Sequence, residues 1–337
     1  MARCETTWDI EGRRLRLSNF DKVLYPDSGF TKRQVIDYYM RIAPALLPHL
    51  AGRPLTVKRY PNGVSEIQFY VKNCPRHRPE WVTTAPIWSE GNHRWMEYCV
   101  VQNLPTLIWL ANLASLELHT SLSSASAISH PSFIVFDLDP GAPANIVQCC
   151  KVALWVRDLF ARSGLRSFVK TSGSKGLHVY IPLNSGVSYD ETKLFARELA
   201  LSLERKHPSL IVSSMRSNRD GKVLVDWSQN DEHKTTVCVY SLRARPQPTV
   251  STPVSWAEIG RCLESEDPAS LEFTAPQVLQ RVEHHGDLFT PLLSLYQQLP
   301  EIAAMESVTH KSRSTATRKT AQPASKRADA GPSRRSA

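Results

Sequence analysis

Several patterns that mark other protein classes are missing from this sequence. The seven cysteines are odd in number and include no CxxC pair, so neither a zinc ribbon nor a disulfide framework is indicated. The N-terminus has no apolar segment of the kind found in secretory signals. We therefore expect a chain that works in a reducing compartment, the cytoplasm.

Long hydrophobic runs are also missing. The most apolar window, residues 100–118, is interrupted by Gln102, Pro105 and Asn112. A membrane-spanning helix needs about 20 consecutive apolar residues. The window therefore predicts a buried helix, and we expect no membrane partner.

An excess of positive charge is confined to one end of the chain. The formal net charge is +9, but 8 of the 41 basic residues and only one of the 32 acids follow position 310. From about residue 305 the composition shifts to Ser, Thr, Ala, Lys and Arg, with little to bury. We expect one catalytic domain over 1–300 and a basic, low-complexity, disordered tail over 301–337. An anion site in the domain must then be a local cluster.

Hydrophobic periodicity predicts a mixed α+β class without internal repeats. One helix starts at Thr31, which stands three residues before Gln34 as in a capping box, and is expected to close at Pro48 and Gly52. Further helices are predicted over about 103–115, 145–163, 189–206, 255–263 and 276–299. Strands are predicted over 55–60, 68–72, 133–137, 167–170, 177–183, 222–227 and 235–240.

Two carboxylates follow an apolar strand in the segment FIVFDLDP. Residues i and i+2 of a strand point to the same face, roughly 6–7 Å apart, so Asp137 and Asp139 are expected side by side. Asp226 ends the similar run KVLVD, and an antiparallel pairing would bring it opposite the first pair. Three such acids suit two Mg²⁺ or Mn²⁺ ions that bridge a triphosphate and activate a hydroxyl.

Other interpretations of the DxD pattern stay open at this point. The two acids could simply end a strand and cap the turn before Pro140. A phosphatase with an aspartate nucleophile is disfavoured, because such sites use DxDx[TV] and here Pro140 and Gly141 follow.

The segment KTSGSKGLH, residues 170–178, lies between two predicted strands. Its two glycines allow close approach of the backbone to a ligand, and Ser172, Lys175 and His178 offer donors suited to phosphate oxygens. It is not a Walker loop, because GxxxxGK[ST] is missing. A polar β-turn with its lysine in water would show the same letters.

The order of these motifs resembles the archaeo-eukaryotic primase superfamily, and more closely the polymerase domain of bacterial ligase D, the end-joining enzyme. Eight words match in family order over about 15–295: LSNFDKVLYP, GRPL, KRYPNG, FDLDP, KTSGSKGLH, VDWSQN, KTT and YSLRAR. The resemblance implies a primase-like fold with mostly antiparallel central sheets flanked by helices. No lysine-x-Asp-Gly ligase motif is found, so a stand-alone polymerase module is expected.

The resemblance also assigns roles to particular residues. Asp137, Asp139 and Asp226 match the catalytic metal-binding triad. The residues that match the nucleotide pocket are Lys58, His119, Ser172, Lys175, His178, Arg219, Gln229, Arg243 and Arg245. His119 could instead be a core histidine. Arg243 and Arg245 would share one face of a strand, where they could grip phosphates or pair with surface acids.

A second set of matches concerns DNA. Asn19, Lys22 and Lys32 match a pocket for a DNA 5′-phosphate, and Lys32 is expected in the first turn of a helix, where free N–H groups favour an anion. Phe69 and Tyr70 match an aromatic pair that stacks on template bases. We expect one of these two rings to be packed in the core instead.

The resemblance implies a metal-dependent, DNA-primed nucleotidyltransferase that fills gaps and extends 3′ ends at breaks, with Mn²⁺ preferred and ribonucleotides favoured. Its expected partners are gapped or broken DNA, NTP or dNTP, and Ku with a DNA ligase, at the bacterial nucleoid. A non-catalytic module that bridges DNA ends and a primase that starts chains de novo are the alternatives. The intact set of acids argues against the first.

Overall fold

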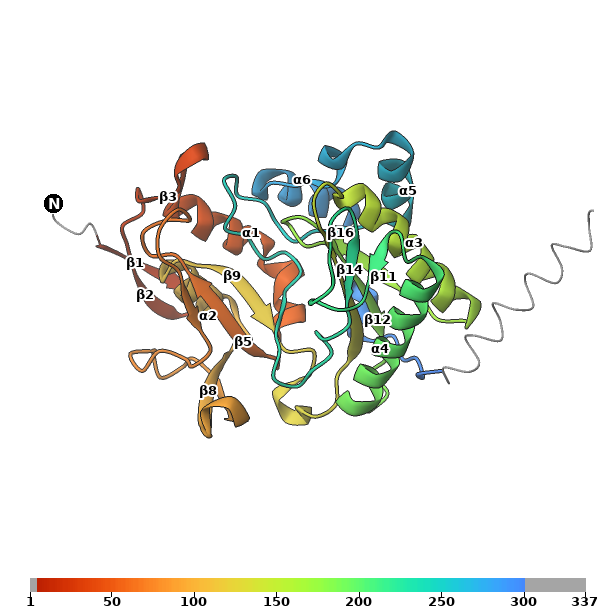
Figure 1. The fold of residues 1–337 in the computed structure, drawn as a ribbon. Helices are drawn as coiled ribbons and strands as arrows, with labels where there is room; N and C mark the ends of the chain where they lie inside the picture. The colour runs from red at the N-terminus through yellow and green to blue at the C-terminus, as the bar shows by residue number, and fades with distance from the viewer. Residues whose placement is uncertain (1–4, 301–337) are drawn as a thin grey trace, which may run out of the picture. The chain divides into compact units, whose positions relative to one another are not determined.

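The computed structural model describes residues 5–300, so the tail predicted over 301–337 lies outside the described residues. Antiparallel sheets flanked by helices make up these residues, which confirms the predicted α+β class (Figure 1). Within this range no helix is both long and apolar enough to cross a bilayer.

One six-stranded sheet carries the acidic motif. Its strand order is β13–β14–β10–β12–β11–β16, and every pair is antiparallel except β13 with β14. The strands are β10 (Phe133–Pro140), β11 (Phe168–Thr171), β12 (Leu177–Pro182), β13 (Ile211–Val212), β14 (Val223–Asp226) and β16 (Pro253–Val254). Helices α3 (Ile146–Arg162) and α4 (Tyr189–Lys206) pack against it (Figure 1).

A second sheet supplies the facing residues. Its order is β15–β9–β5–β8–β7, and β6 also pairs with β5. The strands are β5 (Pro54–Arg59), β6 (Phe69–Val71), β7 (Thr84–Ser89), β8 (Arg94–Val100), β9 (Ser115–Thr120) and β15 (Thr236–Val237). Two hairpins lie outside these sheets, β1 (Glu5–Ile10) with β2 (Arg13–Ser18) and β3 (Val23–Tyr25) with β4 (Phe30–Thr31).

Most of the helices begin at a residue that the sequence marks as a cap. The remaining helices are α1 (Lys32–Leu50), α2 (Leu104–Asn112), α5 (Trp256–Ser265) and α6 (Ala275–His285). Reciprocal capping boxes start α1, α3, α4, α5 and α6, with Thr31 and Gln34 forming the one at α1. In each, the side chain at N3 and the cap satisfy N–H groups that have no partner inside the helix.

Helix α1 ends at Leu50, between the predicted closing residues Pro48 and Gly52; it continues past Pro48 because both His49 and Leu50 are buried. Two other predicted boundaries are wrong. Helix α6 ends at His285, where Gly286 takes a left-handed φ of 66°. The strand predicted over 235–240 shrinks to Thr236–Val237, since the chain turns at Tyr240 with a φ of 62°.

One disulfide contradicts the expectation drawn from the cysteine count. Cys74 and Cys99 are bonded across 25 residues of sequence, and the backbone N–H of Cys74 donates to the Glu97 carbonyl of β8. The pairing joins the segment after β6 to β8, two parts of the chain whose proximity no local pattern shows. Cys149, Cys150, Cys238 and Cys262 are free and buried.

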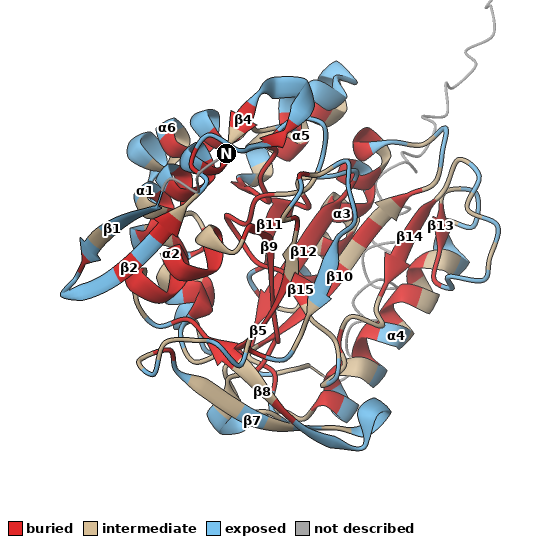
Figure 2. Cartoon of the chain, turned by 90° about the vertical axis from the view of Figure 1, so that its left-hand side faces the viewer, coloured by how far each residue is buried: buried red, intermediate tan, exposed pale blue. Residues whose placement is uncertain are grey.

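Burial is concentrated in the strands between the helices. Every residue of β9 and β12 is buried, whereas β1 and the outer faces of the helices are largely exposed (Figure 2). Polar residues on β9 and β12 are therefore held in fixed surroundings, which is the condition for a precise binding site.

Candidate active site

Four charged or titratable residues form one row across neighbouring strands. Asp226 on β14 lies directly opposite Asp137 on β10, which lies opposite His178 on β12, which lies opposite Lys170 on β11. Directly opposed residues have Cβ atoms about 4.5–5.5 Å apart. The antiparallel approach of Asp226 to the DxD pair, predicted from the sequence, is therefore confirmed.

The three acids hold different partners. Asp137 Oδ1 lies 3.3 Å from His178 Nε2, and Asp139 Oδ2 accepts from Arg219 Nη2 at 2.5 Å. Asp226 Oδ1 accepts from the hydroxyl and the backbone N–H of Ser228, at 2.6 and 2.8 Å. Both acids of the DxD pair lie within β10, so they do not merely cap the turn that follows.

The acids fit a divalent cation by their chemistry and register. Hard cations prefer carboxylate oxygens, and two of the three acids are cross-strand neighbours while the third is two residues along the same strand. Among the described residues, no three His, Cys, Asp or Glu side chains are already grouped as ligands of one ion. Asp139 and Asp226 would have to exchange Arg219 and Ser228 for the ion.

Lys170 is a fully buried lysine to which no separate role was assigned from the sequence. Its Nζ donates to Ser251 Oγ at 2.6 Å and lies 3.2 Å from His178 Nδ1. Burial, together with the nearby Arg243, lowers the pKa of Lys170 to about 7, although Asp137 acts in the opposite direction. The donor at Nδ1 leaves the proton of a neutral His178 on Nε2, facing Asp137.

The same surroundings act on His178 and Asp137. Burial and Lys170 lower the pKa of His178 below its usual range, although Asp137 raises it. Burial raises the pKa of Asp137, but His178, Lys170 and Arg243 outweigh this and hold it below the ordinary value. Asp137 is therefore an anion at neutral pH.

The glycines of the loop between β11 and β12 let its backbone pass close to neighbouring backbone, whereas their predicted approach to a ligand stays a prediction. A Cβ on Gly176 would lie 1.9 Å from the Leu138 carbonyl oxygen, and one on Gly173 would lie 2.6 Å from the Val250 carbonyl carbon. Ser172 Oγ accepts from the backbone N–H groups of Ser174 and Gly176, at 3.2 Å each. This leaves the side chain of Lys175 exposed at the rim.

A cavity of ≈ 290 Å³ brings most of the predicted nucleotide residues together. The predicted residues that line it are His119, Asp137, Asp139, Ser172, Lys175, His178, Gln229 and Arg243. Acids of the first sheet form one wall, and β9 and β15 of the second contribute another part. Residues far apart in the chain thus meet where an anionic ligand and a cation would both find partners.

Four predicted residues lie outside the lining of this cavity. Asp226 is buried behind it, and Gln229 Nε2 donates to Asp226 Oδ2 at 3.2 Å. Lys58 pairs with Glu117, and Arg219 faces Asp139. Arg245 is exposed, and the predicted strand with Arg243 and Arg245 on one face is wrong, because these residues lie outside every strand and the backbone N–H of Arg245 donates to the Arg243 carbonyl in a turn.

The interpretation of His119 as an ordinary core histidine is too simple. The ring is buried, yet it lines the cavity, and its Nε2 lies 2.9 Å from Glu117 Oε2. Glu117 is a further residue that sequence reasoning missed. The available signal was an acid two positions before His119, just beyond the helix predicted over about 103–115, which by itself shows no partner.

A second cavity, of ≈ 470 Å³, contains all three residues matched to a 5′-phosphate. Lys22 Nζ donates to Asn62 Oδ1 at 2.8 Å, and Lys32 Nζ donates to the Ser18 carbonyl at 2.6 Å. Asn19 lies beside them, and Lys32 is the first residue of α1 as predicted. Arg59 also lines this cavity and was missed.

The aromatic pair on β6 differs from the expectation. Phe69 and Tyr70 are each 53% exposed, so the prediction that one of them packs in the core is wrong. Tyr70 contacts the edge of His119, at 6.4 Å between ring centroids, and its hydroxyl lies 3.1 Å from Thr235 Oγ1. Tyr70 thus lies beside the first cavity, whereas Phe69 is the cross-strand partner of Arg59, which lines the second.

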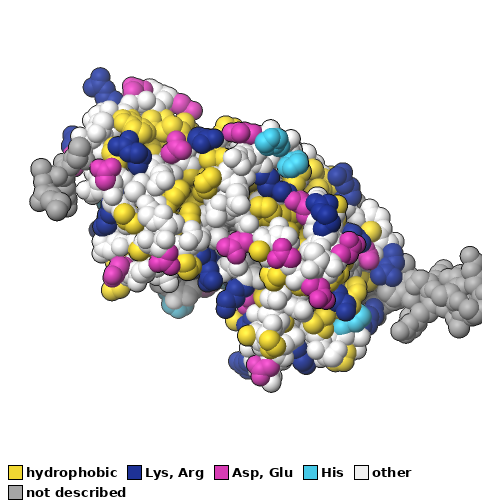
Figure 3. All heavy atoms as spheres, turned by 90° about the horizontal axis from the view of Figure 1, so that it is seen from above, with side chains coloured by type: hydrophobic (Ala, Val, Ile, Leu, Met, Phe, Trp, Pro, Cys, Tyr) yellow, Lys and Arg dark blue, Asp and Glu magenta, His cyan; other side chains and the backbone are white. Residues whose placement is uncertain are grey.

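Charges of both signs are interspersed over the face of the molecule shown in Figure 3. Lysine and arginine side chains alternate there with aspartate and glutamate side chains, with hydrophobic patches between them. This face thus shows no large patch of a single charge.

The comparisons with known proteins agree with this arrangement. The family described as LigD, primase-polymerase domain, matches residues 31–289. The chain is 42% identical over 289 residues to the multifunctional non-homologous end joining protein LigD of Mycolicibacterium smegmatis and 31% identical over 300 residues to the bifunctional LigD of Bacillus subtilis. These alignments cover 85% and 88% of the chain, but 37% and 46% of the relatives.

A solved structure is similar along nearly its whole length. The polymerase domain from Mycobacterium tuberculosis ligase D, in complex with DNA, superposes with a TM-score of 0.77 at 39% identity. The match covers 84% of this chain and 99% of that domain. On these grounds the chain belongs to the LigD primase-polymerase domain family.

Proposed function

We propose that this domain is a metal-dependent, DNA-primed nucleotidyltransferase that fills gaps and extends 3′ ends at DNA breaks. The family makes it an enzyme of the primase-polymerase class, and the relatives are non-homologous end joining proteins. The observation that carries the proposal is the cavity in which the acids of β10 face His119, Lys175 and Arg243. A nucleoside triphosphate with its cations is the ligand that such a pair of walls suits best.

The residues in and beside the cavity have different proposed roles. Asp137, Asp139 and Asp226 are the side chains that would hold Mn²⁺ or Mg²⁺. When bound, two such ions supply Lewis-acid chemistry that activates a 3′-hydroxyl and stabilises the leaving pyrophosphate. Lys175 at the exposed rim and Arg243 on the opposite side are placed to neutralise the triphosphate.

His178 and Lys170 keep the acids in the required state. The Nε2–H of a neutral His178 donates toward Asp137, which keeps that carboxylate ionised and directed along the row. Lys170 Nζ lies 3.2 Å from the other ring nitrogen, Nδ1 of His178. Arg219 neutralises Asp139 until a cation replaces it.

The second cavity supports recognition of a DNA 5′-phosphate. Lys22 and Lys32 bring two amino groups to it. The expectation of free N–H groups at the start of α1 is wrong, because those of Lys32, Arg33 and Gln34 donate to Lys22, Phe20 and Thr31. The related polymerase domain of M. tuberculosis ligase D binds DNA. We propose that this chain binds gapped or broken DNA in the same general manner, with Phe69 and Tyr70 stacked on template bases.

The test is extension of a 5′-phosphorylated gapped duplex with NTP or dNTP in Mn²⁺ or Mg²⁺. We expect extension by the wild type, with Mn²⁺ and ribonucleotides preferred, and none by Asp137→Ala. Lys22→Ala should weaken binding of the phosphorylated gap and leave the 5′-hydroxyl gap nearly unaffected. Undiminished extension by Asp137→Ala would refute the role of the acids.

Two alternatives are decided by the same assay. A non-catalytic bridging module would bind ends without metal-dependent nucleotide binding, and a de novo primase would make products without a primer. Ku, a DNA ligase and the nucleoid are the expected setting and stay part of the proposal, since the relatives' names mention only non-homologous end joining. Co-purification with Ku is the observation that tests this setting.

A further inference from the structure

Glu117 is an almost fully buried acid on β9, 3% exposed, and it makes contact with three of the residues assigned to the nucleotide. Its Oε2 lies 3.3 Å from Lys58 Nζ and 2.9 Å from His119 Nε2. Its Oε1 lies 3.3 Å from Arg243 Nε and accepts from the backbone N–H of Ala244 at 3.0 Å. Both oxygens are thus occupied twice.

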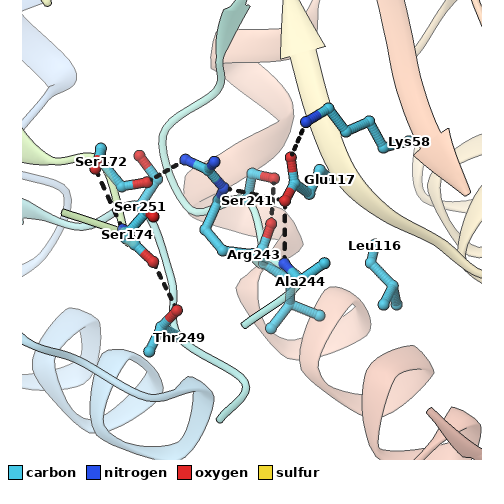
Figure 4. Close-up of polar contacts among 12 residues, drawn as sticks. Lys58, Leu116, Glu117, Ser172, Ser174, Ser241, Arg243, Ala244, Thr249 and Ser251 are labelled. Atoms are coloured by element: carbon cyan, nitrogen blue, oxygen red, sulfur yellow. Dashed lines mark hydrogen bonds and ion pairs between the residues drawn. The ribbon is translucent and has the colours of Figure 1, made fainter. Parts of the chain in front are cut away.

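These contacts are a consequence of how three segments meet. Lys58 on β5 is the cross-strand partner of Glu117, and His119 follows two residues later on the same face of β9. Arg243 arrives from the chain beyond β15 and reaches Glu117 from the side opposite Lys58 (Figure 4). Its Nη1 donates to the Ser172 carbonyl at 2.5 Å, so Arg243 connects Glu117 with the β11–β12 loop (Figure 4).

The charges show that this cluster is more than a surface ion pair. Lys58 and Arg243 are two cations near one buried site, and without an anion between them they would repel each other. Burial would raise the pKa of Glu117, but the hydrogen bond from His119 and the charges of Arg243 and Lys58 hold it well below its ordinary value. Glu117 is therefore permanently ionised, and its position decides where the cationic groups point.

We propose that Glu117 is a positioning residue for the nucleotide. Its carboxylate fixes the ammonium of Lys58, the ring of His119 and the guanidinium of Arg243 before a triphosphate binds. Binding therefore does not have to spend free energy on ordering these three side chains. The inference rests on the proposed function, in that it takes the cavity beside His119 as the nucleotide site. It adds a residue that does not itself line that cavity.

A purely structural role is the competing explanation, since removing a buried charge leaves its partners unpaired and destabilises the fold. The two are separated by the affinity for nucleotide in protein that remains folded. A structural acid changes the fraction of folded protein, whereas a positioning acid changes the dissociation constant of the folded fraction.

The experiment is titration of the full chain with ATP in Mn²⁺, without DNA, for the wild type, Glu117→Gln, Lys58→Met and the double variant. We expect Glu117→Gln to raise the dissociation constant by about tenfold or more. In the double variant the dissociation constant should rise by less than the product of the two single-variant increases, because Glu117 acts partly through Lys58. Unchanged affinity, independent single effects, or tighter binding by Glu117→Gln would each overturn the proposal.

Two further variants keep the test decisive. Glu258 is a half-buried acid that does not line the cavity, and its Oε1 lies 2.6 Å from Arg281 Nη1. The variant Glu258→Gln should lower stability without changing ATP affinity. If Glu117→Gln does not fold, Glu117→Asp retains the charge on a shorter arm that cannot reach all four partners. A folded Asp variant should then bind ATP several-fold more weakly, and wild-type affinity would overturn the proposal.

Failure of this inference is distinguishable from failure of the proposed function. If the wild type extends gapped DNA and Glu117→Gln binds ATP with normal affinity, the positioning role of Glu117 is refuted and the proposed function stands. If the wild type binds ATP but extends no primer, and Glu117→Gln loses affinity for ATP, the proposed function is refuted and the positioning role stands. A wild type that binds no ATP overturns the inference directly.

Discussion

Asp137 and Asp226 lie directly opposite each other on β10 and β14, although 88 residues of sequence separate them. Carboxylate charges at this spacing repel each other, and the two side chains have separate partners, His178 for Asp137 and Ser228 with Gln229 for Asp226. Such an arrangement stores unfavourable charge that a divalent cation would relieve.

Replacing Asp226 by asparagine should separate function from stability. The amide oxygen still accepts from Ser228, and the repulsion with Asp137 is removed, so we expect the free energy of unfolding in urea to stay the same or rise by about 0.5–1 kcal/mol. Metal-dependent extension should fall by at least about a hundredfold. The exposed Asp220→Asn serves as control and should change neither quantity. A strongly destabilised Asp226→Asn would contradict this account.

Gly176 should not tolerate even one methyl group. Its Cβ would lie 1.9 Å from the Leu138 carbonyl oxygen, a backbone atom of β10 that cannot move alone, so Gly176→Ala should lower the free energy of unfolding by more than about 2 kcal/mol. Gly260 in α5 has open space around it, and Gly260→Ala should raise stability by about 1 kcal/mol. Urea denaturation of both variants is the measurement, and equal stabilities would be the contrary result.

Phe69 should matter for DNA and not for folding. The ring is 53% exposed, so Phe69→Ala should leave the thermal midpoint nearly unchanged while it weakens binding of a gapped duplex by about 1–3 kcal/mol. Phe69→Trp should retain binding, because any flat ring stacks. Tyr296, which is 59% exposed, provides the matched control, since Tyr296→Ala should leave DNA affinity as it was.

Recognition of the 5′-phosphate should weaken in mild alkali. Burial, with a smaller contribution from Lys22, lowers the pKa of Lys32 to about 8, so its positive charge is lost as the pH rises through that value. The preference for a phosphorylated over a 5′-hydroxyl gap should therefore decrease between about pH 7 and about pH 9.5 in the wild type and stay level in Lys32→Arg. A constant preference in the wild type would rule out Lys32 as the group responsible.

The lowered pKa of Lys32 also affects folding stability, which should rise with pH where phosphate recognition falls. The folded-state pKa of Lys32 lies below its unfolded value, so between about pH 8 and about pH 10.5 the unfolded chain binds more protons. This lysine therefore makes the folded state relatively more stable as the pH rises through that window. Comparison of urea midpoints for the wild type and Lys32→Met across the window isolates its contribution.

The Cys74–Cys99 bond should contribute measurably to stability. It closes a segment of 25 residues, for which the loss of chain entropy in the unfolded state gives about 3 kcal/mol. Addition of a thiol reductant should lower the urea midpoint of the wild type, and the Cys74→Ser/Cys99→Ser variant should be insensitive to reductant. Equal reductant responses of the two proteins would show that the bond carries no stability.

Local chemistry made much of this molecule predictable. The starts of α1, α3, α4 and α5 follow from a cap residue and its N3 partner, and β10 follows from the run FIVFD. The pairing of Asp226 with Asp137 was predictable because two apolar strands each end near an acid. By contrast, the end of α6 was missed, since Gly286 takes a positive φ and ends the helix at His285, well before residue 299.

The sequence by itself determined the class of the fold, the order of its motifs and the identity of the acids, because these depend on period, capping and residue chemistry along the chain. Only the tertiary structure decided that Glu117 meets Lys58, His119 and Arg243, that Lys170 lies beneath His178, and that Cys74 bonds to Cys99. These contacts join segments far apart in the chain. Their formation depends on how the strands align, and nothing local in the sequence records that alignment.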